Sequence, residues 1–474
     1  MSDDKRVIPR YLDLGSRARI RDIFRRVKRI KPQRVRELLR DLRKNYAGRH
    51  RDLDEAFLRH YAIAARNVRG AGDLDDQQKL LLGAYFTMEY SIEAAALFNP
   101  SIVPHPDQSG LEPGSVRVLM SLRATGEGHI SSIVFRRAIL SRSGIITFAP
   151  PPRYAYAARL ERDRDIHKSV FERRLRDRHL YGEDVAVVLN QLGDSFTLSQ
   201  LEAALNRAAV SPELTAGVRR LSSQLIWMAL ANYELDYPQD CHPEEIVLFP
   251  ATRYESRGME DTRLVRFVEE DGAIRYYGTY TAYDGQRIYP MLLETADFHT
   301  FHIATLWGRY SRNKGMALFP RKVDGSYMML SRHDGENNYV LISHNPYVWN
   351  AATKLQSPRE PWELVQLGNC GSPLETEAGW LVITHGVGPM RRYCLGAILL
   401  DLHDPARVIG RLRRPFLVPT ARERAGYVPN VVYTCGCMIH EGHLTVPYAM
   451  ADSRVSFVSL VVPTLLQRLL DAGP

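Results

Sequence analysis

The residues best suited to chemistry stand together in one stretch, Tyr254–Arg263, which combines three acids (Glu255, Glu260 and Asp261) with two arginines. Gly258 interrupts any regular element within it, and an alternating strand follows from Leu264. Carboxylates beside guanidinium groups stay ionised or act as acids, depending on burial. The pattern fits either acids aimed into a cleft or a surface salt-bridge cluster at the start of a strand.

Other polar loops recur along the chain, each next to an alternating strand. In order they are Phe98–Ser101, Leu122–Glu127, Glu260–Arg263, Lys314–Pro320, Met329–Arg332, Gly371–Thr376, Thr384–Val387, Tyr427–Val431 and Tyr448–Asp452. Their order and chemistry resemble glycoside hydrolase family 130. The match covers residues 98–155 and about 245–460.

This resemblance implies a five-bladed β-propeller that cleaves β-mannosidic bonds of manno-oligosaccharides with inversion. It implies that Asp261 is the general acid, within Glu-Asp-Thr-Arg where the family usually has Glu-Asp-Pro-Arg. It also implies a sugar-binding set: Asn99, Arg123, Arg263, His385, Asn430 and Asp452. The basic positions that would hold phosphate in a phosphorylase are Arg123, Lys314 and Arg332. For Arg332 an ion pair with Asp334 is the alternative, and for His385 a structural place at a strand end.

Glu375 stands where phosphorylase members of the family carry a lysine. A carboxylate there would repel phosphate at close range. It would suit the general base of an inverting hydrolase, which faces the acid at roughly 6.5–9.5 Å. Hydrolysis by a β-1,2-mannosidase-like enzyme is therefore narrowly favoured, and phosphorolysis to mannose 1-phosphate is the alternative. A non-catalytic glycan-binding propeller, with Trp307, Trp349 and Tyr427 as platforms, is a further alternative.

The elements that must position these residues are mainly β. From Glu245 onward, short strands alternate with turns such as Asp271-Gly272 and Asp324-Gly325, as in a sandwich, barrel or propeller. Residues 98–462 are expected to form the β-propeller catalytic domain. A C-terminal helix is expected within 463–474.

Two helical regions lie outside this β framework. Residues 1–97 predict a basic helical N-terminal extension whose third helix runs from about Asp76 to Leu97. Residues 155–240 predict a helical insertion. It leaves after the first strands and returns just ahead of the Asp261 loop, so we expect a lid or wall beside the cleft, or else a packing surface for residues 1–97.

Composition also indicates the cellular location and limits the membrane, metal and cofactor binding that we expect. The five cysteines lie apart, except Cys435 and Cys437, and this favours reduced thiols and a cytoplasmic location. No run of about 18 apolar residues suggests a membrane span. No second Cys/His pair stands at zinc spacing, so no metal is expected. No cofactor is expected beyond inorganic phosphate as the co-substrate of a phosphorylase.

The net charge of +9 comes from the N-terminus, because residues 1–52 hold 18 Lys or Arg against 7 Asp or Glu. Such a segment can bind nucleic acid or a membrane surface. Because no nucleic-acid module is present, neither partner is expected. A solvated face that docks on the main domain or forms a homo-oligomer is favoured.

Overall fold

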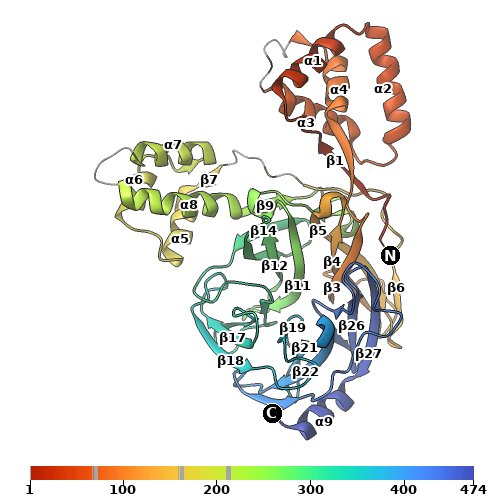
Figure 1. Ribbon diagram of the computed structural model, residues 1–474, viewed down its shortest axis with the longest axis vertical. Coiled ribbons are helices and arrows are strands. Elements are labelled where there is room, and N and C mark those ends of the chain that lie inside the picture. Colours follow the sequence, from red (N-terminus) through yellow and green to blue (C-terminus); the bar gives the residue numbers. More distant parts are fainter. Residues whose placement is uncertain (1, 67, 69–72, 159, 161–164, 210–214) are drawn as a thin grey trace.

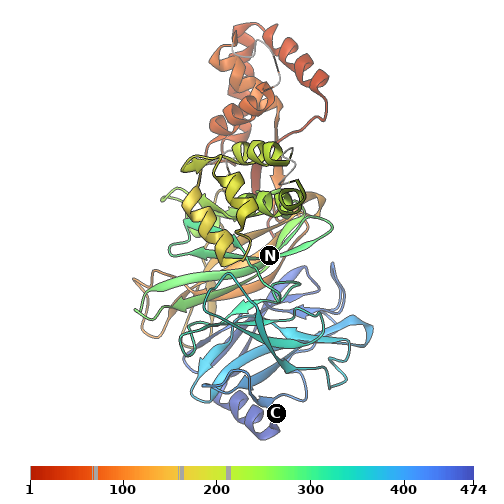
Figure 2. The ribbon, with the colours of Figure 1, turned by 90° about the vertical axis from the view of Figure 1, so that its left-hand side faces the viewer.

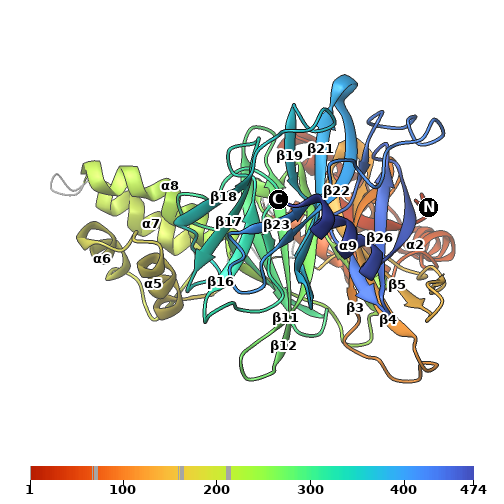
Figure 3. The same ribbon diagram turned by 90° about the horizontal axis from the view of Figure 1, so that it is seen from below.

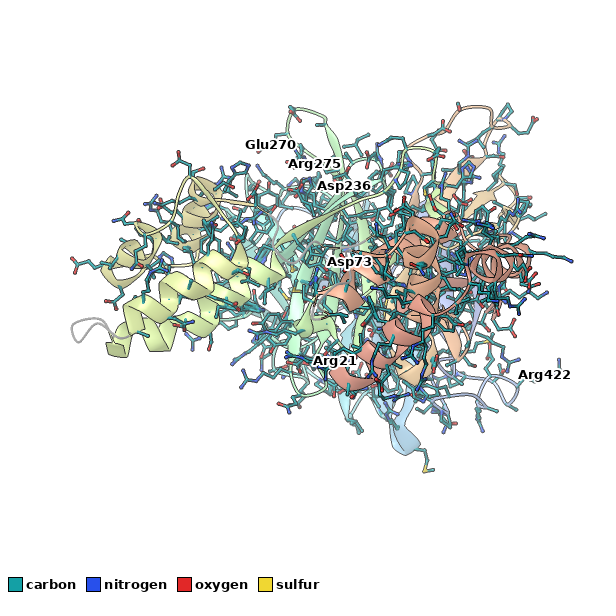
Figure 4. All side chains as sticks on the ribbon, turned by 90° about the horizontal axis from the view of Figure 1, so that it is seen from above. Arg21, Asp73, Asp236, Glu270, Arg275 and Arg422 are labelled. Carbon is teal, nitrogen blue, oxygen red and sulfur yellow. The ribbon has the colours of Figure 1, made fainter. Side chains whose placement is uncertain are left out.

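The computed structural model describes residues 2–66, 68, 73–158, 160, 165–209 and 215–474. An N-terminal unit stands apart from the main body of sheets (Figures 1 and 2). It comprises β1 (Val7–Tyr11), α1 (Arg17–Lys28), α2 (Pro32–Tyr46), α3 (Leu53–Ala65), α4 (Asp76–Tyr85) and β2 (Thr87–Ser91). Seen from above, its helices lie over the sheets, with Arg21 and Asp73 among its charged side chains (Figure 4).

The third expected helix is shorter than predicted. It ends at Tyr85, and the chain turns at Phe86 into β2, which pairs antiparallel with β1 from Val7↔Ser91 to Tyr11↔Thr87. The pairing satisfies the backbone groups of both strands, and it buries Tyr90 at 2% exposure. The extension therefore ends in a β-ribbon rather than in helix.

The largest sheet carries the Asp261 loop. Its path is β3 (Ala96–Pro104), β4 (Val116–Thr125), β5 (Ser131–Leu140), β11 (Gly258–Val268), β12 (Ile274–Tyr283), β13 (Ile288–Thr295), β14 (Thr300–Thr305) and β9 (Tyr233–Asp236), with β6 (Ile146–Phe148) and β10 (Val247–Leu248) beside β5. The two halves of this sheet, one ending at β5 and the other beginning at β11, meet where β5 and β11 pair in parallel at Gly258↔Ser131.

Three smaller antiparallel sheets complete the β framework. They are β15 (Ala317–Leu318), β16 (Tyr327–Ser331), β17 (Asn338–Ser343) and β18 (Ala351–Gln356); β19 (Gln366–Asn369), β20 (Leu374–Thr376), β21 (Gly379–Gly388), β22 (Arg392–Leu400) and β23 (Val408–Arg411); and β24 (Val432–Tyr433), β25 (Met438–His440), β26 (His443–Met450) and β27 (Arg454–Val461). They follow one another around a common centre (Figures 1 and 3).

The last sheet returns to the first. Cys435 N donates to Pro100 O in β3 at 2.8 Å, so loops from both ends of the β framework meet. The fold is mainly β, as expected, and the number of blades stays a prediction. The C-terminal helix α9 (Val462–Ala472) begins one residue before the expected segment and buries Leu465 and Leu469 against β23.

The insertion forms a helical unit at one side of the sheets (Figures 1 and 3). It holds β7 (Ile166–His167), α5 (Lys168–Asp177), α6 (Glu183–Leu189), β8 (Ser195–Phe196), α7 (Leu198–Ala209) and α8 (Thr215–Ala231). Phe171, Phe196 and Leu201 lie in its own apolar core. It meets the large sheet at the β13–β14 side, where Arg178 Nη2 donates to Thr305 O at 3.2 Å. The insertion is therefore a side wall of the sheet and does not cross the centre.

None of the helices in the described part of the chain is long and apolar enough to cross a membrane.

Candidate active site

Asp261 sits in a β-bulge. The pairing of β11 with β12 shifts register between Glu260 and Arg263, and Asp261 has a φ of 57°. A bulge turns a side chain out of the strand's alternation, and a non-glycine residue in the left-handed region costs of order 1–3 kcal/mol. The local backbone is thus held in an unfavourable form that re-aims this carboxylate.

Asn99 is placed by a second bulge, in the neighbouring part of the same sheet. The register of β3 with β4 shifts between Phe98 and Ser101, and Asn99 has a φ of 50°. Its Nδ2 donates to Asp261 Oδ1 at 2.7 Å. Its Oδ1 is buried and has no hydrogen-bond partner in the described structure. The two bulges therefore bring a carboxylate and an amide together.

Arg123 and Lys314 surround the acids. Arg123 donates to Glu260 Oε1 at 2.7 Å and to Asp261 Oδ1 at 3.3 Å, while its Nε donates to Ser131 Oγ. Lys314 Nζ donates to Glu260 Oε2 at 2.7 Å. Glu260 is thus fully engaged by two cations. Arg123 and Lys314 are therefore both ion-paired with the acids in this structure.

The carboxyls of Asp261 and Asp452 have pKa values pushed in opposite directions. Burial raises the pKa of Asp261, but the charges of Arg123, Lys314 and Arg263 outweigh burial and lower that pKa to about 2. Burial and the charge of Asp261 raise the pKa of Asp452, which follows β26, to about 6. A pair of this kind separates a carboxylate that is ionised over the whole physiological range from one that takes up a proton just below neutral pH.

A chain of basic and aromatic groups adjoins the acids, starting at Arg263, whose Nη1 donates to Asp261 O at 3.1 Å. Arg263 Nη2 donates to Tyr433 OH at 2.8 Å, and the Tyr433 ring meets the His385 ring edge-on at 5.0 Å. Arg332 Nη1 lies 3.4 Å from His385 Nε2. Burial and the charges of Arg332 and Arg263 hold the pKa of His385 well below its usual value. A neutral His385 can therefore accept from Arg332.

Arg263 and Arg332 have no carboxylate oxygen within 4 Å among the described residues. The Nε of each is buried without a hydrogen-bond partner. The alternative ion pair with Asp334 is absent, because that carboxylate accepts from the backbone and side chain of Asn337 and from Tyr339. Asp261 offsets the charge of Arg263 only from beyond ion-pair distance. A bound anion would supply a direct counter-charge to both guanidinium groups.

Asn369 adds to this unsatisfied set. It is fully buried, yet neither its Oδ1 nor its Nδ2 has a hydrogen-bond partner in the described structure. A Cβ on Gly315, next to Lys314, would lie 3.5 Å from Arg332 Cβ and 3.8 Å from Asn369 Oδ1, which places these groups side by side. Asn369 and Tyr433 were missed from the sequence, because nothing in their neighbourhood marks them until the strands are paired.

The structure corrects the prediction for Glu375. Its carboxylate accepts from Arg321 Nε at 2.8 Å in an exposed ion pair. It lies opposite Trp380, five residues along β21 from His385, and so roughly 16 Å away along the strand. Glu375 therefore does not face Asp261 as a base. The sequence alignment was wrong because it could not show that β20 pairs with the outer end of β21.

The remaining residues predicted for the site differ in burial and in their contacts. Asn430 is half-buried with a φ of 64°, and its carbonyl accepts from Tyr393 N. Trp349 is fully buried and cannot be a sugar platform. Tyr427 is exposed and stacks on His129. Trp307 is half-buried at the insertion.

The two cysteines of the Cys-x-Cys pair are buried, and burial raises the pKa of each thiol. Within the part of the chain that the structure describes, no group of three or more metal-ligating side chains gathers.

Comparison with known proteins shows which family this chain is similar to. A family model for glycoside hydrolase family 130, described as beta-1,4-mannooligosaccharide phosphorylase, matches residues 237–469. The 1,2-beta-oligomannan phosphorylase of Thermoanaerobacter sp. (strain X514) is 34% identical over 226 residues, 45% of this chain and 72% of that protein. The beta-1,2-mannobiose phosphorylase of Listeria innocua is 28% identical over 235 residues, 48% of this chain and 64% of that protein.

Among solved structures, the beta-1,2-mannobiose phosphorylase from Listeria innocua in complex with beta-1,2-mannobiose aligns with a TM-score of 0.48 and 17% identity. The alignment covers 80% of this chain and 93% of that one.

Proposed function

The chain belongs to glycoside hydrolase family 130, and we propose that it is a phosphorylase that cleaves β-mannosides with inorganic phosphate and releases mannose 1-phosphate. The substrate class proposed is a β-1,2-linked manno-oligosaccharide, because several of the related proteins are named for that linkage. The proposed framework is a five-bladed propeller with the site at its centre.

One observation carries the choice of phosphate over water: Arg263 and Arg332 flank His385 with no carboxylate partner in the described structure. A phosphate dianion would supply the missing counter-charge, and guanidinium forks suit its oxygens. Lys314 would add a third cation if Glu260 shared it. Hydrolysis loses its main support, because Glu375 is held by Arg321 away from the site.

The proposed reaction is a single displacement. A phosphate oxygen forms the bond to the anomeric carbon while the bond from that carbon to the leaving sugar's oxygen breaks. The Asp261–Asp452 pair supplies the proton that this leaving oxygen takes, and the configuration inverts. Asn99 holds Asp261, and its unpartnered Oδ1 is free for a sugar hydroxyl.

Phosphate and acid are coupled through charge. The pKa of Asp261 lies near 2 because three cations face it. A phosphate bound to Arg263 would cancel part of that positive field and raise the pKa of Asp261. The acid would thus become competent to donate when the nucleophile is in place.

The test is incubation with β-1,2-, β-1,3- and β-1,4-mannobiose, each with and without phosphate. We expect mannose 1-phosphate from the β-1,2 substrate, with cleavage abolished when phosphate is omitted. Glu375→Gln is a matched control, expected to behave like the native protein. Release of free mannose at the same rate without phosphate would refute phosphorolysis, and loss of activity in Glu375→Gln would restore that residue as a base.

A further inference from the structure

A cavity of about 490 Å³ lies between the helical insertion and the large sheet. The insertion contributes Arg178 and Trp227, and the loop after β14 contributes Trp307, Arg309 and Arg312. No aspartate or glutamate lines it among the described residues. It is therefore a positively charged cavity with aromatic walls.

Arg178 is the most unusual of these residues. Its side chain is 3% exposed, and it donates only to backbone carbonyls, of Arg174 at 2.9 Å and of Thr305 at 3.2 Å. Among the described residues its buried Nε has no hydrogen-bond partner, and none of the ion pairs found there involves Arg178. Burial and the charge of Arg174 lower the pKa of Arg178 to about 10. A buried guanidinium that lacks a counter-charge is costly, and a ligand anion would relieve that cost.

The aromatic wall is built for a ring-shaped ligand. The rings of Trp227 and Trp307 lie 5.3 Å apart, and Tyr289 packs on the first at 6.0 Å. Trp227 Nε1 is buried without a hydrogen-bond partner in the described structure, although a buried indole N–H usually finds one. The apolar face of a sugar ring can lie on such a surface while its polar groups meet the free donors.

The cavity lies at the same end of the sheet as the acids. Glu260 pairs with Thr281, which pairs with Pro290, a residue of the cavity wall. Two strand spacings separate Glu260 from Pro290, roughly 10 Å. Pro290 also lines a small pocket with Arg263 and Asn313, so it stands between the two sites. A substrate of a few sugar units can reach from one to the other.

We propose that this cavity is an acceptor-side subsite for an anionic substituent, a phosphate or a carboxylate, carried by the sugar beyond the scissile bond. Arg178, Arg309 and Arg312 bind the anion, and Trp227 and Trp307 hold the sugar ring. The inference rests on the proposed function for its position along the substrate. It makes the preferred acceptor a phosphorylated or uronic sugar rather than a neutral one.

The test uses the synthetic direction, with mannose 1-phosphate as donor and mannose, mannose 6-phosphate or glucuronate as acceptor. The native protein should show a KM about tenfold or more lower for at least one anionic acceptor, as expected for hydrogen bonds to a charged group. The preferred acceptor distinguishes phosphate from carboxylate. The double variant Arg309→Met/Arg312→Met should lose this preference while retaining its KM for mannose. Arg21→Met, an arginine of the N-terminal unit, is the matched control (Figure 4).

Direct titration separates this inference from the proposed function. Each acceptor is titrated calorimetrically into native and variant protein in phosphate-free buffer, and the double variant, which keeps Arg263 and Arg332, shows which part of the binding belongs to this cavity. Tighter binding of an anionic acceptor that disappears in the double variant supports the subsite even if no mannoside is made. Equal binding of neutral and anionic acceptors, or an unchanged preference in the double variant, overturns it.

Discussion

Asp261 and Asp452 show how one site can hold two carboxyls in different states. Asp261 lies beside three cations and loses its proton readily, whereas burial and the charge of Asp261 raise the pKa of Asp452, so that Asp452 holds its proton to higher pH. Their titration belongs to the pair, since each charge depends on the other. At the scale of single residues, the role of proton donor therefore belongs to the two carboxyls together.

Replacing Asp261 with asparagine should lower phosphorolysis of mannobiose by about 10²–10⁴-fold, because general acid catalysis contributes that much. The amide oxygen can still accept from Asn99, so the fold should survive. A substrate with a leaving group that needs no proton, such as a dinitrophenyl mannoside, should lose far less. Steady-state kinetics on both substrates checks this, and near-normal turnover of mannobiose by the folded variant contradicts it.

Asp452→Asn should stabilise the protein at alkaline pH. The pKa of Asp452 in the folded state, about 6, lies above the unfolded value of about 3.9. The folded state therefore binds more protons between these values, and stability falls as pH rises through about 6. The variant should gain on the order of 1–3 kcal/mol at pH 8 and nothing at pH 4.

Urea unfolding of native protein, Asp452→Asn and the exposed control Asp4→Asn at both pH values measures this gain. An equal gain at pH 4 and pH 8 would show that Asp452 does not carry a raised pKa.

At the scale of elements, two β-bulges do the positioning. Asn99 and Asp261 leave the alternation of β3 and β11 at register shifts, and each takes a positive φ. The order of the polar loops and the acidic stretch could be recognised from the sequence, because they depend only on residue types and on their order along the chain. The bulges could not, since they depend on which residues pair across two strands.

The two sequence predictions that were wrong, for Glu375 and for the helix up to Leu97, have the same origin. Glu375 was placed in the site by its resemblance to a position of the family, but its location depends on the pairing of β20 with the outer end of β21. The helix expected to reach Leu97 ends at Tyr85, because β1, more than seventy residues earlier, pairs with the next segment. In both cases the position depends on strand pairing, which the local sequence pattern does not reveal.

Gly368 in β19 offers a test of the anion side of the site. A Cβ there would lie 2.5 Å from His385 Cε1 and 3.1 Å from Arg332 Cδ, so Gly368→Ala must displace both. We expect the KM for phosphate to rise about tenfold, the loss of roughly one charged hydrogen bond. The KM for mannobiose should change less. Gly48→Ala, where nothing lies within 4 Å, is the control, and an unchanged phosphate KM in Gly368→Ala would contradict the assignment.

At the scale of the whole molecule, the chain joins three parts of different character. The sheets carry the catalytic groups, the insertion adds an aromatic and cationic wall at β13–β14, and the N-terminal unit stands above them (Figure 2). Of the expected lid or wall, the insertion takes the lateral position, and its role beside the cleft stays a prediction. The association of the N-terminal helices with a second copy stays a prediction.

The central claim is that phosphate, held by Arg263 and Arg332, is the nucleophile. Cleavage of β-1,2-mannobiose with phosphate labelled throughout with ¹⁸O, followed by mass spectrometry, tests it most directly. The account predicts mannose 1-phosphate that retains every labelled oxygen, because the carbon–oxygen bond forms to phosphate, and it predicts no cleavage without phosphate. Free mannose formed at an equal rate in the absence of phosphate would contradict it.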